Sequence, residues 1–109
     1  MENDLIAYVG NKGIIKNEKG EVLIIKETHS MNWELPGGKI QNTEIESKLQ
    51  DCLARELAEE LGQDFKFQIL DIADTMFRTF DKTRNPLVTK VFLVVWNVKY
   101  LGGEINHQA

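Results

Sequence analysis

The residues best suited to chemistry lie between positions 36 and 62. A glycine turn, Pro36-Gly37-Gly38-Lys39, is followed by Glu44 and then by the run Arg55-Glu56-Leu57-Ala58-Glu59-Glu60-Leu61-Gly62. Carboxylates this close together repel one another and raise each other's pKa. A divalent cation turns such a cluster into a ligand set, and Mg²⁺ prefers carboxylate oxygens and is commonly shared with substrate phosphates. The pattern therefore indicates metal-assisted chemistry on a phosphate group.

A helix is expected to carry these carboxylates. Glu56, Glu59 and Glu60 are related by i,i+3 and i,i+4 spacing, which places them on one helix face. Arg55 falls beside Glu59, where it can neutralise and orient a carboxylate. An apolar stripe adjoins this face and should pack on a sheet. Its members are Leu53, Ala54, Leu57 and Leu61. The string alone is ordinary composition for a surface helix, and the glycine turn before it favours a site.

The boundaries of this helix can be predicted from its flanking residues. Ser47 and Gln50 fit a capping box, with Ser47 as the N-cap. Gly62 is placed to end the helix. Gly37 and Gly38 allow the backbone to approach a ligand closely. Lys39 is either a phosphate contact or a solvent-exposed charge.

The remaining sequence reads as strands on both sides of the helix. This order predicts one α+β domain over residues 1–109 with a mixed β-sheet. The expected strands are Leu5 to Lys16, Val22 to Ile25 (buried on both faces), Trp33 to Leu35, Phe65 to Ile72, Thr75 to Phe80, and Thr89 to Tyr100. Trp33 and Trp96 are expected in the core, with base stacking as the alternative. Phe77 to Phe80 could line a nucleotide pocket, with Arg78 on a phosphate, or Arg78 could face water.

Composition and charge limit the partners. The chain has 109 residues, 42% of them hydrophobic, and a net charge of −4, which argues against binding a nucleic-acid polymer. Its single cysteine, Cys52, excludes a disulfide within the chain and a zinc cluster built on cysteines. The first residues lack the pattern of a signal peptide, and no apolar run approaches the length needed to span a membrane. We expect a cytoplasmic protein with a small-molecule ligand and no membrane contact.

The segment from Trp33 to Gly62 resembles the Nudix box of the Nudix hydrolases, the MutT-like nucleotide pyrophosphohydrolases. The chain supplies eight of the nine fixed positions of that pattern: Gly38, Glu44, Arg55, Glu56, Leu57, Glu59, Glu60 and Gly62. The resemblance implies a Nudix-type αβα sandwich. The family usually has a further C-terminal helix, which this chain lacks, so either the chain is C-terminally truncated or a homodimer covers the exposed face.

Two departures from the family pattern bear on the site. Ten residues separate Glu44 from Arg55, where the pattern has seven. The three extra residues either lengthen the loop before Ser47 or lengthen the helix and displace Glu44 from Glu56. In addition, Gln63 stands where the pattern has an aliphatic residue that packs inward, which predicts a cost in stability.

The resemblance also implies a function and a set of site residues. It implies hydrolysis of a pyrophosphate bond in a nucleoside diphosphate linked to another group, with Mg²⁺ or Mn²⁺ as cofactor. Glu56, Glu59 and Glu60 would bind the metal, with the Gly37 carbonyl as a further ligand, and Glu56 or Glu59 would act as base. Arg55 would orient a glutamate, and Glu44 would brace the loop against the helix.

The substrate and the catalytic competence stay open at this level. A (deoxy)nucleoside triphosphate, including an oxidised guanine nucleotide, is the first expectation, and ADP-ribose or a nucleotide sugar is the second. The alternative function is a non-catalytic Nudix-like module that binds a nucleotide or ADP-ribose as a sensor. Glu104 is a candidate for an additional acidic group beyond the box, or simply a solvated residue.

Overall fold

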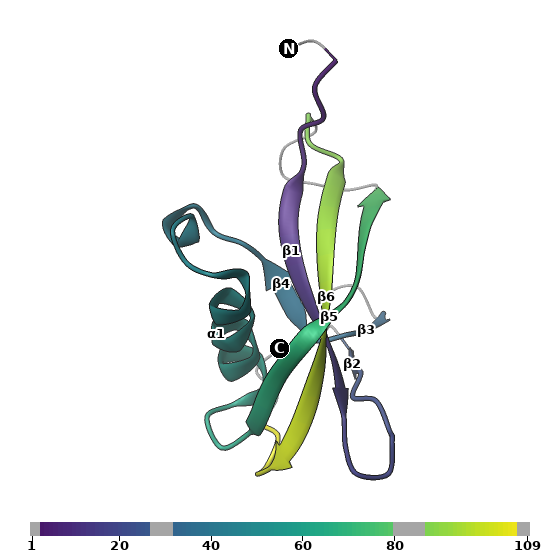
Figure 1. Ribbon diagram of the computed structural model, residues 1–109, viewed down its shortest axis with the longest axis vertical. Helices are drawn as coiled ribbons and strands as arrows, with labels where there is room; N and C mark the ends of the chain where they lie inside the picture. The colour runs from purple at the N-terminus through teal and green to yellow at the C-terminus, as the bar shows by residue number, and fades with distance from the viewer. Residues whose placement is uncertain (1–2, 27–31, 80–86, 107–109) are drawn as a thin grey trace.

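The chain folds around a four-stranded sheet with one helix against it (Figure 1). The computed structural model describes residues 3–26, 32–79 and 87–106. A separate two-stranded sheet, β2–β3, lies beside the larger one. The elements are β1 (Tyr8–Lys16), β2 (Ile25–Lys26), β3 (Trp33–Glu34), β4 (Gly37–Lys39), a 3₁₀ turn η1 (Asn42–Glu44), α1 (Leu49–Leu61), β5 (Lys66–Thr79) and β6 (Lys90–Gly102).

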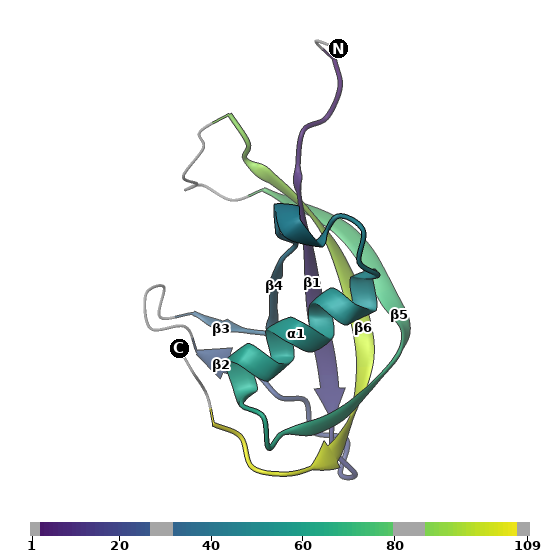
Figure 2. The ribbon, with the colours of Figure 1, turned by 90° about the vertical axis from the view of Figure 1, so that its left-hand side faces the viewer.

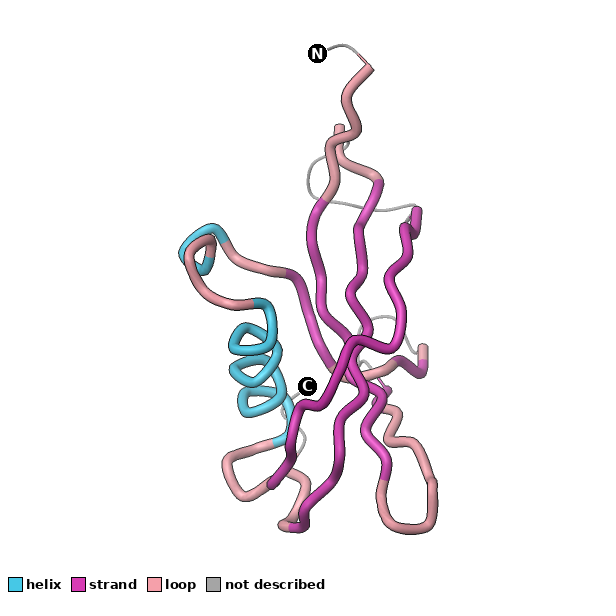
Figure 3. Tube along the Cα trace, in the orientation of Figure 1, coloured by secondary structure: helices cyan, strands magenta, loops and turns pink. Residues whose placement is uncertain are grey.

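The larger sheet is mixed, as the sequence predicts. Its strand order is β4-β1-β6-β5. The central strands β1 and β6 run parallel, with Tyr8 opposite Val91 and Lys16 opposite Lys99. The outer strands β4 and β5 are antiparallel to their neighbours. The tube in Figure 3 shows the long strands of this sheet together, with the helix standing beside them. The expected α+β architecture with a mixed sheet is therefore confirmed.

The core lies between α1 and the sheet face that α1 covers (Figure 2). Buried residues of β1 and β6 meet three leucines of the helix there. The cluster comprises Ile15, Ile25, Leu53, Leu57, Leu61, Phe65, Val94, Trp96 and Val98. Within the described ranges α1 is the one α-helix, and none follows β6 there. None of the described helices has the length and apolar character needed to cross a bilayer.

Three strand expectations need correction. Val22 to Ile25 is not a strand buried on both faces, because Val22 and Ile24 are exposed and only Ile25, in β2, is buried. Val22 makes a single bridge to Lys16. Continuous apolar character here reflects alternation between core and solvent rather than two covered faces.

The two strands expected over Phe65 to Ile72 and Thr75 to Phe80 form one strand, β5. Its pairing with β6 slips between Ile69 and Ile72 and again between Ile72 and Asp74. These bulges break the sequence alternation without ending the strand. Phe80 lies outside the described residues. The first strand begins at Tyr8 rather than at Leu5.

Candidate functional site

Helix α1 is held by the stripe that the sequence predicts. Leu53, Leu57 and Leu61 are fully buried against the sheet, and Ala54 is half-buried. The helix ends at Gly62, whose φ of 90° is in the left-handed region and whose N–H donates to the Ala58 carbonyl over 3.1 Å. Burial of this stripe fixes which way the neighbouring carboxylate face points.

The start of the helix differs from the prediction. The N-cap is Lys48 rather than Ser47, and no side chain caps it. The carbonyl of Lys48 instead accepts from the N–H groups of Asp51 and Cys52, each over 3.1 Å. The Ser47 N–H donates to the Glu44 carbonyl over 2.9 Å, so Ser47 belongs to a turn before the helix.

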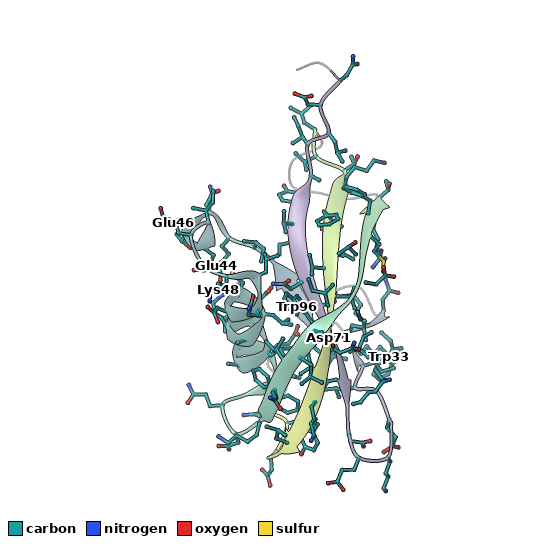
Figure 4. All side chains as sticks on the ribbon, in the orientation of Figure 1. Trp33, Glu44, Glu46, Lys48, Asp71 and Trp96 are labelled. Atoms are coloured by element: carbon teal, nitrogen blue, oxygen red, sulfur yellow. The ribbon has the colours of Figure 1, made fainter. Side chains whose placement is uncertain are left out.

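The three extra residues therefore lengthen the loop and leave the site in register. Residues 45–48 form the connection between η1 and α1, and Ile45 within it is 84% exposed. Figure 4 shows Glu44, Glu46 and Lys48 grouped at the end of α1 where the connection from η1 arrives. Glu44 is not displaced from the helix, because its contact with Arg55 is intact.

Arg55 links Glu44 to Glu59. Its Nε and Nη2 donate to the two carboxylate oxygens of Glu44 over 2.7 and 2.9 Å. Its Nη1 donates to Glu59 Oε2 over 3.0 Å. The two bonds from Arg55, joined by the Gln41 N–H, lower the pKa of Glu44 to about 2. Glu44 thus braces the loop against the helix, as the resemblance implies, and Arg55 lies beside Glu59 as the helix spacing predicts.

Glu56 differs from the other glutamates of the site in its burial and in its hydrogen bonding. It is 7% exposed, and its Oε1 atom is buried without a hydrogen-bond partner. Burial raises the pKa of Glu56 to about 7, although the Arg55 charge opposes the rise. Burying a carboxylate whose oxygen lacks a partner costs free energy, and a bound proton or cation removes this cost.

The glycine turn faces this carboxylate. A Cβ atom on Gly38 would collide with Glu56 Oε2, so a larger residue at this position would push the Glu56 carboxylate from its present place. Gly37 has a φ of 145°, and a Cβ there would collide with the Asn11 backbone in β1. Its N–H donates to Glu60 Oε1 over 3.0 Å, which ties the third helix glutamate to the turn.

These groups border one pocket of about 450 Å³. It is lined by Gly37, Lys39, Ile40, Gln41, Arg55, Glu56, Glu59 and Glu60. The structure therefore places all the metal ligands predicted from the sequence around one pocket. Glu44 contacts Arg55, which lines the pocket, and is not among the lining residues itself. Lys39 is also on this pocket, with its Nζ 4.5 Å from the centre of the Tyr8 ring.

The donor set suits a hard divalent cation, although the carboxylates have separate partners in the protein alone. Among the described residues, no three acidic, cysteine or histidine side chains already converge as a metal cluster. Glu59 is turned to Arg55 and Glu60 to the Gly37 N–H. Mutual repulsion between carboxylates favours such separate partners in the protein alone. The unpartnered Oε1 of Glu56 is the atom that most directly fits a metal.

A second pocket lies on the sheet face turned away from α1. It measures about 560 Å³, and its lining includes Lys12, Trp33, Leu35, Met76 and Arg78. Trp33 is 62% exposed, so the expectation that it belongs to the core is wrong, whereas Trp96 is buried as expected. Figure 4 shows the two tryptophans at different depths, with Trp33 out on the side away from α1. Arg78 lines this pocket and is also exposed, so its position agrees with both interpretations of that residue.

The fold and this arrangement define a Nudix-type domain. A model of the NUDIX domain family matches residues 11–109, and the chain belongs to that family. Over 64 residues the chain is 42% identical to an RNA pyrophosphohydrolase of Ruthia magnifica subsp. Calyptogena magnifica, which covers 58% of this chain and 34% of that protein. The chain thus spans about a third of the length of this relative.

Solved structures agree on the fold. The MutT protein from Methanosarcina mazei Go1 superposes with a TM-score of 0.74 at 25% identity, over 96% of this chain and 72% of that one. An ADP-ribose pyrophosphatase from Streptococcus suis 89-1591 superposes with a TM-score of 0.65 at 22% identity, over 95% and 68% of the two chains. The latter likeness shows the shared fold.

Two features of the site were missed by sequence reasoning. Gln63, expected to cost stability, is exposed, and Phe65 two residues later fills the core instead. Asn11, in β1, is completely buried and hydrogen-bonded to the start of α1. The signal available in the sequence was the single amide of β1, a strand whose other polar side chains are mainly the two lysines, Lys12 and Lys16.

Proposed function

We propose that this chain hydrolyses a pyrophosphate bond in a nucleoside diphosphate linked to another group, with Mg²⁺ or Mn²⁺ as cofactor. The observation that carries the proposal is the buried, unpartnered Oε1 of Glu56 on a pocket lined by two further glutamates of the same helix. Membership of the NUDIX domain family supports the same activity.

The proposed metal ligands are Glu56, Glu59, Glu60 and the Gly37 carbonyl. When bound, the metal would activate a water molecule and stabilise the charge that develops on phosphoryl oxygens. Glu56 supplies a carboxylate that is already desolvated, so it gains the most from a cation. Gly37 reaches the same pocket from β4, and its N–H keeps Glu60 at the edge of that pocket.

Glu59 is the better placed of the two base candidates. Its side chain is 66% exposed, so water reaches it, while Glu56 is buried. Arg55 holds Glu59 Oε2 over 3.0 Å and thereby orients its carboxylate toward the pocket that both residues line. A general base needs this kind of fixed geometry before its pKa matters.

We propose a (deoxy)nucleoside triphosphate as substrate, lying across the segment that separates the two pockets. Leu35 lines the pocket on the far face of the sheet, and Gly37, two residues on, lines the carboxylate pocket. The exposed ring of Trp33 offers a stacking surface for a base, and Arg78 offers a cation on the same pocket. The phosphates would then reach the carboxylate pocket, where Lys39 supplies positive charge.

The test is a product-release assay with Mg²⁺ or Mn²⁺ over a panel of compounds. The panel holds the common nucleoside and deoxynucleoside triphosphates, an oxidised guanine nucleotide, ADP-ribose and a nucleotide sugar. Turnover of at least one compound is expected, and Glu59→Gln and Glu60→Gln should each lower kcat by about 10²-fold or more through loss of metal-assisted catalysis. Glu46→Gln is the matched control, because Glu46 is exposed and close in the sequence to Glu44. The assignment would be refuted if Glu59→Gln and Glu60→Gln kept full activity, or if Glu46→Gln lost as much activity as they do.

A second candidate substrate is the 5′-triphosphate end of an RNA. The observation that favours it is the 42% identity over 64 residues to an RNA pyrophosphohydrolase. A triphosphorylated RNA oligonucleotide added to the panel separates this substrate from free nucleotides by the ratio of kcat/KM values. Nucleotide binding without turnover of any compound would favour the sensor alternative. The homodimer and the cytoplasmic location stay predictions.

A further inference from the structure

Asn11 is a polar residue buried completely within the core layer of the molecule. It lies in β1, and none of its surface is exposed. Its Nδ2 donates to the carbonyl of Leu49 over 2.9 Å, and its Oδ1 accepts from the indole Nε1 of Trp96 over 2.9 Å. An amide in the core would be costly if either bond were missing. Both ends of this side chain are therefore used.

The two partners place Asn11 at the junction of the elements that build the site. Leu49 is the first residue of α1, the helix that carries the glutamates, and Trp96 belongs to the central strand β6. In the sheet, Asn11 lies opposite Gly38 of β4. Gly38 is the residue on which a Cβ would collide with Glu56 Oε2. One residue of β1 thus touches the start of the helix and neighbours the glycine against which the helix glutamate packs.

The apolar stripe alone does not fix the position of the helix along its axis, so directional bonds must do so: the Gly37–Glu60 bond acts near the end of α1, and the Asn11–Leu49 bond acts at its start. Apolar burial is not directional, so Leu53, Leu57 and Leu61 hold α1 down without setting where it stops. A slide of the helix along its axis by about 1.5 Å, the rise of one residue, would keep the stripe on the sheet and still displace every side chain of the site. A hydrogen bond to a particular carbonyl is lost under such a shift, because its geometry is narrow.

We infer that Asn11 is a positioning residue for the carboxylate pocket: its bond to the Leu49 carbonyl sets the position of α1 relative to β4, and so the placement of Glu56 against Gly38. This inference rests on the proposed function, because it concerns how well the same pocket binds a metal and turns over substrate. Asn11 does not border the pocket and acts through the helix.

The test compares Asn11→Leu with Trp96→Phe. Asn11→Leu keeps a side chain of similar size and removes both hydrogen bonds. Trp96→Phe removes the indole donor and keeps the amide that binds Leu49, so it reports the general cost of disturbing this part of the core. We expect Asn11→Leu to weaken Mn²⁺ binding and lower kcat, each by about 10- to 100-fold, since a displacement of about 1 Å remote from the chemistry can cost this much. KM should change by less than about threefold, because the far pocket is untouched.

Trp96→Phe should keep Mn²⁺ affinity and kcat within about threefold of the unmodified chain while its melting temperature falls. Mn²⁺ affinity is measured by electron paramagnetic resonance on the unmodified chain and on each variant without substrate. Should Asn11→Leu not fold, Asn11→Ser replaces it, because a serine hydroxyl is too short to reach Leu49, and the same losses are expected.

Three outcomes overturn the inference. The first is an Asn11 variant that binds Mn²⁺ and turns over substrate like the unmodified chain, which leaves the proposed function standing. The second is an equal loss in Trp96→Phe, which would mean that the effect is general loosening of the core. The third is an unmodified chain that neither binds Mn²⁺ nor hydrolyses any compound, which overturns the proposed function together with this inference.

Discussion

Glu44 and Glu56 lie on either side of the same arginine in the sequence order of the site, and their surroundings are opposite. Glu44 accepts two bonds from Arg55 and one from the Gln41 N–H, and these bonds lower its pKa to about 2. Glu56 is buried, one of its oxygens has no partner, and burial raises its pKa to about 7. One carboxylate is fully satisfied by protein groups, and the other is not.

This difference separates architecture from chemistry. The Glu44–Arg55 pair is complete in the protein alone, so it can brace the η1–α1 connection whatever else is bound. Glu56 carries an electrostatic cost that a cation or a proton would remove. Buried groups with strongly perturbed pKa values gather at functional sites, and here geometry and pKa agree on the same residue.

The largest effect in a test of this comparison is expected at Glu56. Glu56→Gln should lower metal-dependent kcat by about 10²-fold or more, because a proposed metal ligand is lost. The same change should raise the melting temperature of the metal-free protein near pH 8, because a buried charge is removed. Activity and thermal unfolding in chelator measure the two effects. A variant that loses activity and also loses stability would show that Glu56 is structural.

Glu44→Gln should mainly lower stability and have a smaller effect on activity, the reverse of Glu56→Gln. The amide cannot accept two charge-assisted bonds from Arg55, so stability should fall to the same extent with and without Mn²⁺. Activity should fall by only about tenfold, the low end for a group that orients others around a metal. Urea unfolding with and without Mn²⁺, together with kcat, checks this. Loss of Mn²⁺ affinity larger than that of Glu56→Gln would invert the comparison.

The pH dependence of stability should also separate the two carboxylates. In metal-free protein the pKa of Glu56 rises from 4.5 unfolded to about 7 folded, so its contribution is fully present below 4.5 and is lost as pH rises through 7. Glu44, with its pKa lowered from 4.5 to about 2, contributes above 4.5 and loses that contribution as pH falls through 2. Urea midpoints in chelator should therefore decline between about pH 5 and 7 and level off above, since Glu56 is then ionised in both states. Glu56→Gln should flatten that decline, and an unchanged slope in this variant would contradict the assignment.

Features of the site that follow from local periodicity could be predicted from the sequence, and features that depend on distant contacts could not. The helix face, the stripe under it and the Arg55–Glu59 contact follow from helical periodicity, and the structure confirms them. The turn around Ser47 could not be predicted this way, because backbone N–H groups donate to the Lys48 and Glu44 carbonyls in place of the expected side-chain cap. The exposure of Trp33 and the bulges of β5 depend on which face each residue finds in the sheet, which local pattern does not decide. The role of Asn11 depends on a contact with a residue 38 positions away, which no local pattern encodes.

The smallest effect is expected where the chain departs from the family spacing. Replacing Ile45, Glu46 and Ser47 by Gly-Ser-Gly should leave kcat and Mn²⁺ affinity within about twofold, because the exposed connection only spans from Glu44 to α1 and the Glu44–Arg55 bonds do not depend on its side chains. Stability should fall by about 0.5–1 kcal/mol for each added glycine, through the greater freedom of the unfolded chain. Kinetics and urea unfolding measure both quantities. A tenfold loss of kcat at unchanged stability would mean that the insertion contributes a group to the site. The loop would then belong with Glu56 among the residues that act in chemistry, and not with Glu44 among those that brace the structure.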